Sequence, residues 1–168
     1  MFDRLLFALT LFSALGCGLV AGVFFAFSSF VMNALARLPA AQGIAAMQSI
    51  NVVVINPLFM TAFLGTAAAC VLLAFTSVLR FREPGAAYLL AGSLLYLFGV
   101  ILVTMVFNVP RNDALAAVAP ASPEGASLWT NYLGSWTAWN HVRTAASFAA
   151  AALLTIAIVL NRLMVFEK

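Results

Sequence analysis

The chain has 168 residues, of which 65% are hydrophobic and only 8% are charged, a composition outside the range of soluble globular proteins. The net charge is +3, but the Lys and Arg residues are scattered singly at the ends of apolar runs and form no stripe that could follow a nucleic-acid backbone. The composition therefore predicts one integral membrane domain over residues 1–168, in contact with the lipid bilayer and with no nucleic-acid partner.

Four apolar runs are long enough to cross a bilayer as helices, and they cover about residues 5–32, 52–79, 86–109 and 139–160. Residues 34–51 are broken by Pro39 and Gly43, which predicts an interfacial loop with a helical turn or two. The polar turn at residues 80–85 reverses the chain, and the aromatic residues within 126–137 predict a short interfacial helical segment before the fourth span. Short connections favour an all-α, integral membrane four-helix bundle with up-down-up-down topology.

Positive charge is distributed unevenly between the two ends of this topology. Five Lys and Arg residues fall at one end: Arg4, Arg80, Arg82, Arg162 and Lys168. Three fall at the other end: Arg37, Arg111 and Arg143. Because cytoplasmic loops carry an excess of Lys and Arg, this bias predicts that both termini are cytoplasmic, in a bacterial cytoplasmic membrane.

Small residues recur at every fourth position of the first span: Ala14, Gly18, Gly22 and Ala26. Such a face lets another helix approach closely, and it is a candidate surface for a homo-oligomer. Cys17 and Cys70 lie deep inside apolar runs with no CxxC or Cys/His spacing, which favours packing over redox or metal chemistry. With a single histidine and no carboxylate inside a span, the sequence predicts no metal site and no cofactor.

Asparagines gather on the non-cytoplasmic side of the predicted topology. Seven of the eight belong there: Asn33, Asn51, Asn56, Asn108, Asn112, Asn131 and Asn140. An unpaired buried amide costs on the order of a few kcal/mol, so several converging amides should pair with one another, with water or with a ligand. The asymmetry predicts a polar cup that opens outward.

The predicted cup has a floor, a rim and an aromatic wall. Asn56, Thr104, Asn108 and Asn140 form the floor, Arg111, Asn112 and Arg143 the rim, and Trp129, Tyr132, Trp136 and Trp139 the wall. Each group has a structural alternative: the tryptophans as anchors in an interfacial aromatic belt, Arg143 as a snorkelling side chain, and the asparagines as hydrogen bonds between helices.

The stretch WTAWNHVRT, residues 136–144, concentrates the polar residues of the fourth span. At about 100° per residue one helix face carries Trp136, Trp139, Asn140, Arg143 and Ser147. His141 points well away from that face, which favours an interfacial residue over a catalytic base. No GxSxG, HExxH, P-loop or GxGxxG motif is present in the sequence.

Four stretches in this order resemble a family of small four-span membrane proteins that includes anthrone oxygenase-like proteins. They are AGVFFAFSSFVMNALARLP at 21–39, AAMQSINVVVINPLFM at 45–60, VTMVFNVPRND at 103–113 and WTAWNHVRT at 136–144. The resemblance implies conversion of an anthrone to an anthraquinone with dioxygen, without a metal or flavin. That chemistry needs a deprotonated carbon, donors that hold the negative charge and an apolar pocket for a flat substrate.

The resemblance also implies roles for the members of the cup. Asn108, Asn140, Arg111 and Arg143 would donate to the enolate oxygen, Trp136 and Trp139 would stack on the substrate rings, and His141 would be the base if local geometry turned it inward. The helical phase of His141 is wrong for that role, and no carboxylate is an obvious substitute. The catalytic candidates are therefore His141, Arg143, Asn140 and Asn108, and the other members of the cup are substrate-binding candidates.

Three functions remain open at the level of the sequence. The first is a cofactor-independent oxygenase that acts on a small aromatic compound. The second is a module that binds or transports an amphipathic or anionic small molecule in the same cup. The third is a structural membrane subunit whose small-residue faces bind partner helices and whose asparagines only join its own helices.

Overall fold

The computed structural model describes residues 2–166, with side chains for residues 4–161, and the fold of this part is all-α without strands. Four helices are long and apolar enough to cross a membrane: Arg4–Ala36, Pro57–Leu79, Ala86–Ala116 and Pro123–Asn161. The predicted all-α fold with four membrane-spanning helices is confirmed. The chain is a multi-pass membrane protein.

Two of these long helices contain π-helical turns. Helix α1 (Phe2–Ala26) continues through a π-helical turn at Phe27–Val31 into α2 (Met32–Ala36). Helix α5 (Ala86–Tyr96) continues through π-helical stretches at Leu97–Leu102 and Thr104–Asn108 into α6 (Val109–Ala116). Helices α3 (Ala40–Val53), α4 (Pro57–Leu79) and α7 (Pro123–Phe166) complete the fold. Such π-helical turns are rare and frequently mark functional sites.

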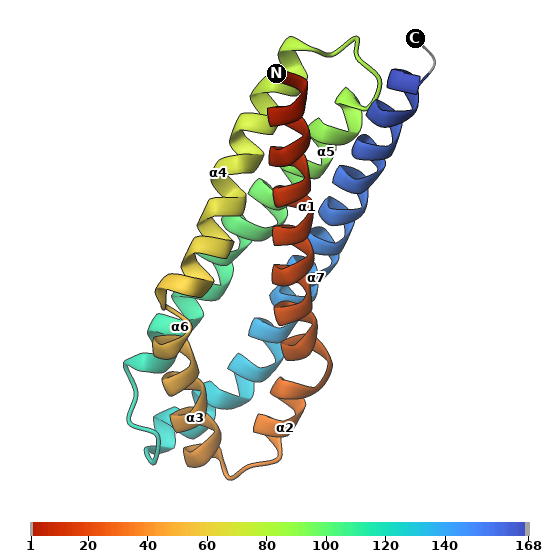
Figure 1. The fold of residues 1–168 in the computed structure, drawn as a ribbon. Helices are drawn as coiled ribbons and strands as arrows, with labels where there is room; N and C mark the ends of the chain where they lie inside the picture. The colour runs from red at the N-terminus through yellow and green to blue at the C-terminus, as the bar shows by residue number, and fades with distance from the viewer. Residues whose placement is uncertain (1, 167–168) are drawn as a thin grey trace.

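The long helices pack side by side in a closed order. Helix α1 packs on α4 and α7, and α5 packs on the same two helices. Figure 1 shows α1 starting and α7 ending at the same end of the molecule, with α2, α3, α6 and the start of α7 at the opposite end. Side chains from all four long helices, including Val20, Leu73, Tyr96 and Leu154, form the first apolar core.

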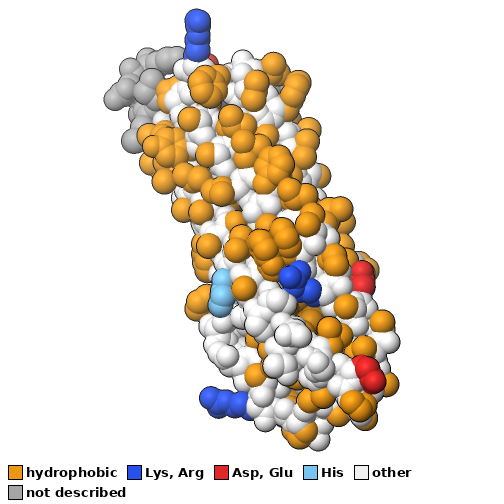
Figure 2. All heavy atoms as spheres, turned by 180° about the vertical axis from the view of Figure 1, so that it is seen from behind, with side chains coloured by type: hydrophobic (Ala, Val, Ile, Leu, Met, Phe, Trp, Pro, Cys, Tyr) orange, Lys and Arg blue, Asp and Glu red, His pale blue; other side chains and the backbone are white. Residues whose placement is uncertain are grey.

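A second apolar core lies at the end opposite the termini (Figure 1), and it consists of Met32, Leu35, Ile44, Met47, Leu115, Trp129, Tyr132 and Trp136. Figure 2 shows apolar side chains along the flank of the long helices, with charged ones at the top and over the lower half of the molecule. Large apolar side chains such as Leu15, Leu58 and Phe75 are more than half exposed, as lipid contact requires.

The segment predicted as an interfacial loop contains a 14-residue helix, α3. Pro39 stands at the N-cap of this helix, where its missing N–H costs nothing. Gly43 lies under the ring of Trp129, so that a Cβ there would approach Trp129 Cζ2 within 2.9 Å. Pro39, predicted to break a helix, therefore marks the start of one, and Gly43 provides the space for the Trp129 ring.

The segment predicted as a separate interfacial helix is the first part of α7. This helix has 44 residues, or about 66 Å at 1.5 Å per residue, which is about twice the thickness of the hydrocarbon core. A large part of α7 must therefore extend outside the membrane. The third span likewise runs past Pro110, which occupies one of the first two positions of α6, directly after a π-helical stretch.

Helix α1 packs closely on α4 at Gly16. A Cβ at Gly16 would overlap Oγ1 of the buried, β-branched Thr66, whose rotamer has little freedom. The predicted face of small residues on the first span is not packed in this way, because a Cβ at Gly18 or Gly22 would meet no atom within 4 Å. The role of this small-residue face in binding another helix, including one from a second copy, stays a prediction.

Replacing Gly16 with alanine is expected to lower the free energy of unfolding by about 1–3 kcal/mol, because overpacking forces Thr66 or the backbone to shift. The matched control is Gly18→Ala on the same helix, which should be neutral or stabilising by up to about 1 kcal/mol. Unfolding in detergent, followed by circular dichroism, measures both. Equal stabilities of the two variants would contradict the close packing of α1 on α4.

Candidate functional site

Asn140 and Arg143 form the centre of the site, one turn apart on α7. Asn140 is fully buried and Arg143 is 5% exposed, and Trp136 and Ser147 on the same face are buried as well. His141 is exposed and Trp139 is half-buried. The burial of Asn140 and Arg143 and the exposure of His141 agree with the predicted helical phase, whereas Trp139, expected on the same face, is only half-buried.

The Asn140 amide joins α7 to α1. Its Nδ2 donates to the Phe24 carbonyl oxygen and to Ser28 Oγ, both at 2.7 Å. The π-helical turn that contains Ser28 begins three residues after Phe24 and disturbs the regular backbone ladder there. Ser28 Oγ also lies 3.1 Å from Thr144 Oγ1. Asn140 is therefore the hydrogen-bonding centre of this helix contact.

Asn140 also fixes the arginine. Its Oδ1 accepts from Arg143 NH2 at 2.7 Å, and Arg143 NH1 donates to Thr104 Oγ1 at 3.3 Å. The guanidinium carbon lies 4.2 Å from the centre of the Phe24 ring and 5.0 Å from that of the Trp136 ring. Phe24 belongs to the first apolar core and Trp136 to the second, so the cation is held at the junction of the two.

The buried Arg143 has no carboxylate partner among the described side chains. Both of its side-chain hydrogen bonds go to neutral oxygen atoms, and Glu83, Asp113 and Glu124 are exposed at the surface. Its Nε is buried without any hydrogen-bond partner. A buried charge of this kind is costly unless an anion compensates it, so Arg143 has a free donor that can accommodate a negatively charged group.

Asn108 adds an unpaired acceptor to the same region. Its Nδ2 donates to the Trp136 carbonyl oxygen at 3.3 Å, and its Oδ1 is buried without a partner. Thr104 begins one π-helical stretch and Asn108 ends it, so both predicted floor residues of this helix lie where the helix is widened. Unsatisfied buried polar atoms are rare in proteins, and here one donor and one acceptor lie around Trp136.

Four of the predicted rim and wall residues form a connected group next to the arginine: Asn112, Trp129, Tyr132 and Trp136. Asn112 Oδ1 accepts from Tyr132 Oη and from Trp136 Nε1, each at 2.8 Å. The ring of Tyr132 stacks between those of Trp129 and Trp136, with ring centres 5.5 and 6.0 Å apart. The three rings are buried in the second apolar core, so they do not form a lipid-facing belt.

Arg111 and Trp139 lie on the side where α7 meets the π-helical stretch before α6. Arg111 Nε donates to Ser135 Oγ at 3.0 Å, and its NH1 donates to the Phe107 carbonyl oxygen at 2.6 Å. The Trp139 ring stacks face to face on Phe107 with 3.6 Å between ring centres. The partners of Arg111 and Trp139 therefore lie on α7 and on the third membrane-spanning helix.

Asn56 is not brought into this cluster by the contacts that the structure describes. Its Oδ1 accepts from the Phe59 backbone N–H at 3.0 Å, and its Nδ2 donates to the Val53 carbonyl oxygen at 3.0 Å. Asn56 is the N-cap of α4, with proline as the first helical residue. Local capping uses the amide that the sequence assigned to the floor of the cup.

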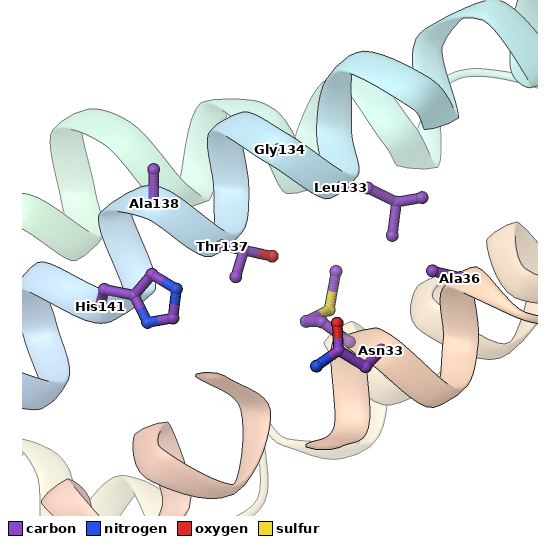
Figure 3. A pocket seen from close by; sticks show the side chains of 8 residues that line it. Asn33, Ala36, Leu133, Gly134, Thr137, Ala138 and His141 are labelled. Atoms are coloured by element: carbon purple, nitrogen blue, oxygen red, sulfur yellow. The ribbon is translucent and has the colours of Figure 1, made fainter. Parts of the chain in front are cut away.

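His141 lines a groove on the outside of the molecule. The groove has a volume of about 350 Å³ and lies between α2 and α7, where it is lined by Met32, Asn33, Ala36, Leu133, Gly134, Thr137, Ala138 and His141. Figure 3 shows the Asn33 amide and the Thr137 hydroxyl directed into the space between the two helices. A histidine here can act on a ligand in the groove, but it has no described contact with Arg143.

Three residues around Asn140 are not among the predicted site residues: Phe24, Ser28 and Thr144. Phe24 contributes a backbone carbonyl and a ring face, and neither depends on a polar side chain. Ser28 and Ser29 are adjacent hydroxyl residues at the end of an otherwise apolar run, which was the available signal for this part of α1. Within the described residues no group of three or more His, Cys, Asp and Glu is placed to hold a metal ion.

Comparison with known proteins gives one match. Residues 59–153 match the family described as anthrone oxygenase. The matched region is more than half of the chain and contains Thr104, Asn108, Asn140 and Arg143. No curated protein and no solved structure matches the chain.

Proposed function

Because the chain belongs to the anthrone oxygenase family, we propose that it is a membrane enzyme that oxidises a methylene carbon of a small, flat aromatic compound to a carbonyl with dioxygen. In this reaction two C–H bonds break and one oxygen atom forms the new carbonyl group. The second oxygen atom leaves as water with the two hydrogens. An anthrone, in which two aromatic rings flank the methylene, is the substrate type.

The buried and uncompensated charge of Arg143 is the observation that supports this chemistry best. Loss of the first methylene proton gives an anion whose charge is delocalised onto the ketone oxygen. Arg143 Nε, buried without a partner, can donate to that oxygen while Asn140 and Thr104 hold the two terminal nitrogens. A preorganised donor away from water stabilises such charge far more strongly than water does. The substrate anion would then supply the electrons that reduce dioxygen, so the reaction needs no metal or flavin.

The neighbouring groups complete the proposed site. Asn108 Oδ1 is an unpaired acceptor that can hold a hydroxyl hydrogen of the substrate or of a hydroperoxide intermediate. Phe24 and Trp136 flank the guanidinium and provide apolar surfaces for a flat ring system. His141 lies in the outer groove, so a role as the base applies to a substrate in that groove and not to one held by Arg143.

The proposal is tested by aerobic turnover of an anthrone with the purified protein in lipid nanodiscs. We expect one molecule of dioxygen consumed per quinone formed, followed with an oxygen electrode and by absorbance. Because anthrones oxidise slowly in air by themselves, the matched control is Arg143→Met in the same nanodiscs. Equal rates for the wild type, the variant and empty nanodiscs would contradict the function.

A binding module for an aromatic anion is the second candidate, and it is favoured by the same buried cation. It would be supported if a phenolic aromatic compound raised the melting temperature of the wild type without any uptake of dioxygen. The Arg143→Met variant should then lose that thermal shift, since the anion would have no positive charge to bind.

We also propose that both termini face the cytoplasm. In the sequence, five Lys and Arg residues belong to the side of the predicted topology that carries the termini and three to the other side, and this excess matches the charge bias of cytoplasmic loops. The arginine site would then lie toward the non-cytoplasmic side. A C-terminal fluorescent protein that matures only in the cytoplasm tests the orientation, and a dark fusion that is made in full would contradict it.

A further inference from the structure

The proposed anion site is closed in this structure, so a substrate needs a way into it. Arg143 is 5% exposed and Asn108 is 1% exposed, and Asn140 is fully buried. The rings of Phe24 and Trp136 cover the guanidinium. A flat three-ring molecule can reach Arg143 only if a neighbouring side chain moves.

The groove between α2 and α7 has the shape and lining that a flat ring system requires. Its volume of about 350 Å³ lies within the usual range for small-molecule sites. Gly134, Ala138 and His141 follow one face of α7, a run of about 10 Å at 1.5 Å per residue, close to the length of three fused rings. Gly134 and Ala138 leave that face flat, and a Cβ at Gly134 would meet no atom within 4 Å.

The polar groups of the groove fit an uncharged ligand that carries a hydroxyl or a carbonyl. Asn33, Thr137 and His141 line it, and no Lys, Arg, Asp or Glu is among its described lining residues. Asn33 Nδ2 already donates to the Ser29 carbonyl oxygen at 3.0 Å. The neutral form of an anthrone-type compound, apolar over its rings and polar at its oxygens, matches this lining.

Met32 connects the groove to the interior. It lines the groove and is nevertheless only 3% exposed, and it packs in the second apolar core together with Trp136. It also follows directly on the π-helical turn at Phe27–Val31, and that turn contains Ser28, a partner of Asn140. Methionine is unbranched and changes rotamer easily, so it can open a path that a β-branched side chain would block.

From these observations we propose that the groove between α2 and α7 is the docking site through which the neutral aromatic substrate enters, and that Met32 is the gate between this groove and Arg143. The inference rests on the proposed oxygenase function for the identity of its ligand. Occupancy of the groove can be measured without turnover, which separates a failure of this inference from a failure of the proposed function.

Thiol protection tests the docking site directly. In Gly134→Cys the new thiol lies in the open groove, whereas Cys17 and Cys70 are fully buried and give little background. We expect a hydroxylated anthraquinone, which has the shape of the product but cannot be oxidised further, to slow labelling by N-ethylmaleimide at least fivefold. The control Ala117→Cys, exposed after the end of α6, should be labelled at an unchanged rate. No protection at Gly134→Cys, or equal protection by a simple fatty acid, would overturn the docking site.

Filling the groove tests whether substrate passes through it. Gly134→Phe is expected to lower kcat/KM about tenfold with kcat changed less than twofold, because the reaction at Arg143 is left intact. The control Ala117→Phe, which adds a ring at an exposed position outside the groove, should behave as the wild type. Met32→Val, a β-branched gate, should also lower kcat/KM and leave the protection of Gly134→Cys in place. Normal kcat/KM in Gly134→Phe would overturn the path even if the protein is an active oxygenase.

Discussion

Replacing Arg143 with methionine is expected to lower anthrone turnover by about 100-fold or more, the usual effect of losing a donor to a developing oxyanion. The same change is expected to leave thermal stability equal or higher. The two effects go in different directions because the wild-type residue is a buried cation with no described carboxylate partner. Apolar replacement of buried ionic groups by side chains of similar volume is often neutral or stabilising.

One compensating loss limits the gain in stability. Without Arg143 the Asn140 Oδ1 has no donor, and an unsatisfied buried acceptor costs about 1–3 kcal/mol. Initial rates of dioxygen uptake and unfolding in detergent measure the two quantities on the same preparation. Parallel loss of activity and of stability would identify Arg143 as a structural residue.

Arg111→Met is the matched control for this experiment. Arg111 is half-buried, and its side-chain hydrogen bonds go to Ser135 and to the Phe107 carbonyl oxygen, away from the Asn140 group. We expect the activity of Arg111→Met to stay within about threefold of the wild type, because the Arg111 guanidinium is only half-buried and has no described contact with Arg143 or Asn140. An equal loss in both variants would mean that positive charge in general, and not the buried Arg143, supports turnover.

The central part of the site could be predicted from sequence because topology and helical phase together determine it. The joined ends of the third and fourth spans bring Thr104, Asn108, Asn140 and Arg143 to one level, and the 100° repeat places the last two on one face. The structure places all four around Trp136 and Phe24. The same 100° repeat predicts that His141 lies away from the face of Asn140 and Arg143, and His141 is exposed.

The parts that sequence reasoning missed depend on local backbone geometry or on packing. Asn56 was assigned to the cup, but the proline that follows it makes it a helix cap, and capping occupies its amide. The Phe24 carbonyl oxygen accepts a hydrogen bond from Asn140 next to a π-helical turn, and no residue pattern in α1 predicts that turn. The sequence predicts a loop with only a helical turn or two where α3 lies, because the packing of Gly43 on Trp129 is a tertiary contact that a local pattern does not contain.

The Asn140→Asp variant is expected to fold, but its turnover rate should be about 100-fold lower than that of the wild type. The reason is that the new carboxylate pairs with Arg143 in place of the substrate anion. The carboxylate would stand where Asn140 Oδ1 now accepts from Arg143 NH2 at 2.7 Å. A neutralised guanidinium has little remaining attraction for the substrate anion. The new ion pair offsets the loss of the two hydrogen bonds that Asn140 Nδ2 donates to Phe24 and Ser28.

Asn140→Leu is the control of similar volume that supplies no anion. It removes every hydrogen bond of this amide and leaves Arg143 buried with less compensation, so we expect a loss of about 3–5 kcal/mol in the free energy of unfolding. Circular dichroism and size-exclusion chromatography in detergent separate a folded, inactive Asp variant from an unfolded Leu variant. An Asp variant as active as the wild type would rule out the anion site.

The double variant Arg143→Met with Asn140→Asp distinguishes one shared effect from two separate ones. Each single change removes the uncompensated positive charge, one by deleting the cation and the other by pairing it. In the double variant the new carboxyl group has no cation, and burial keeps it in the neutral form. If the positive charge of Arg143 is what holds the substrate anion, the double variant should then be no less active than the less active single variant, because residues in one network are not additive. Multiplied losses would instead show that Asn140 and Arg143 support turnover independently.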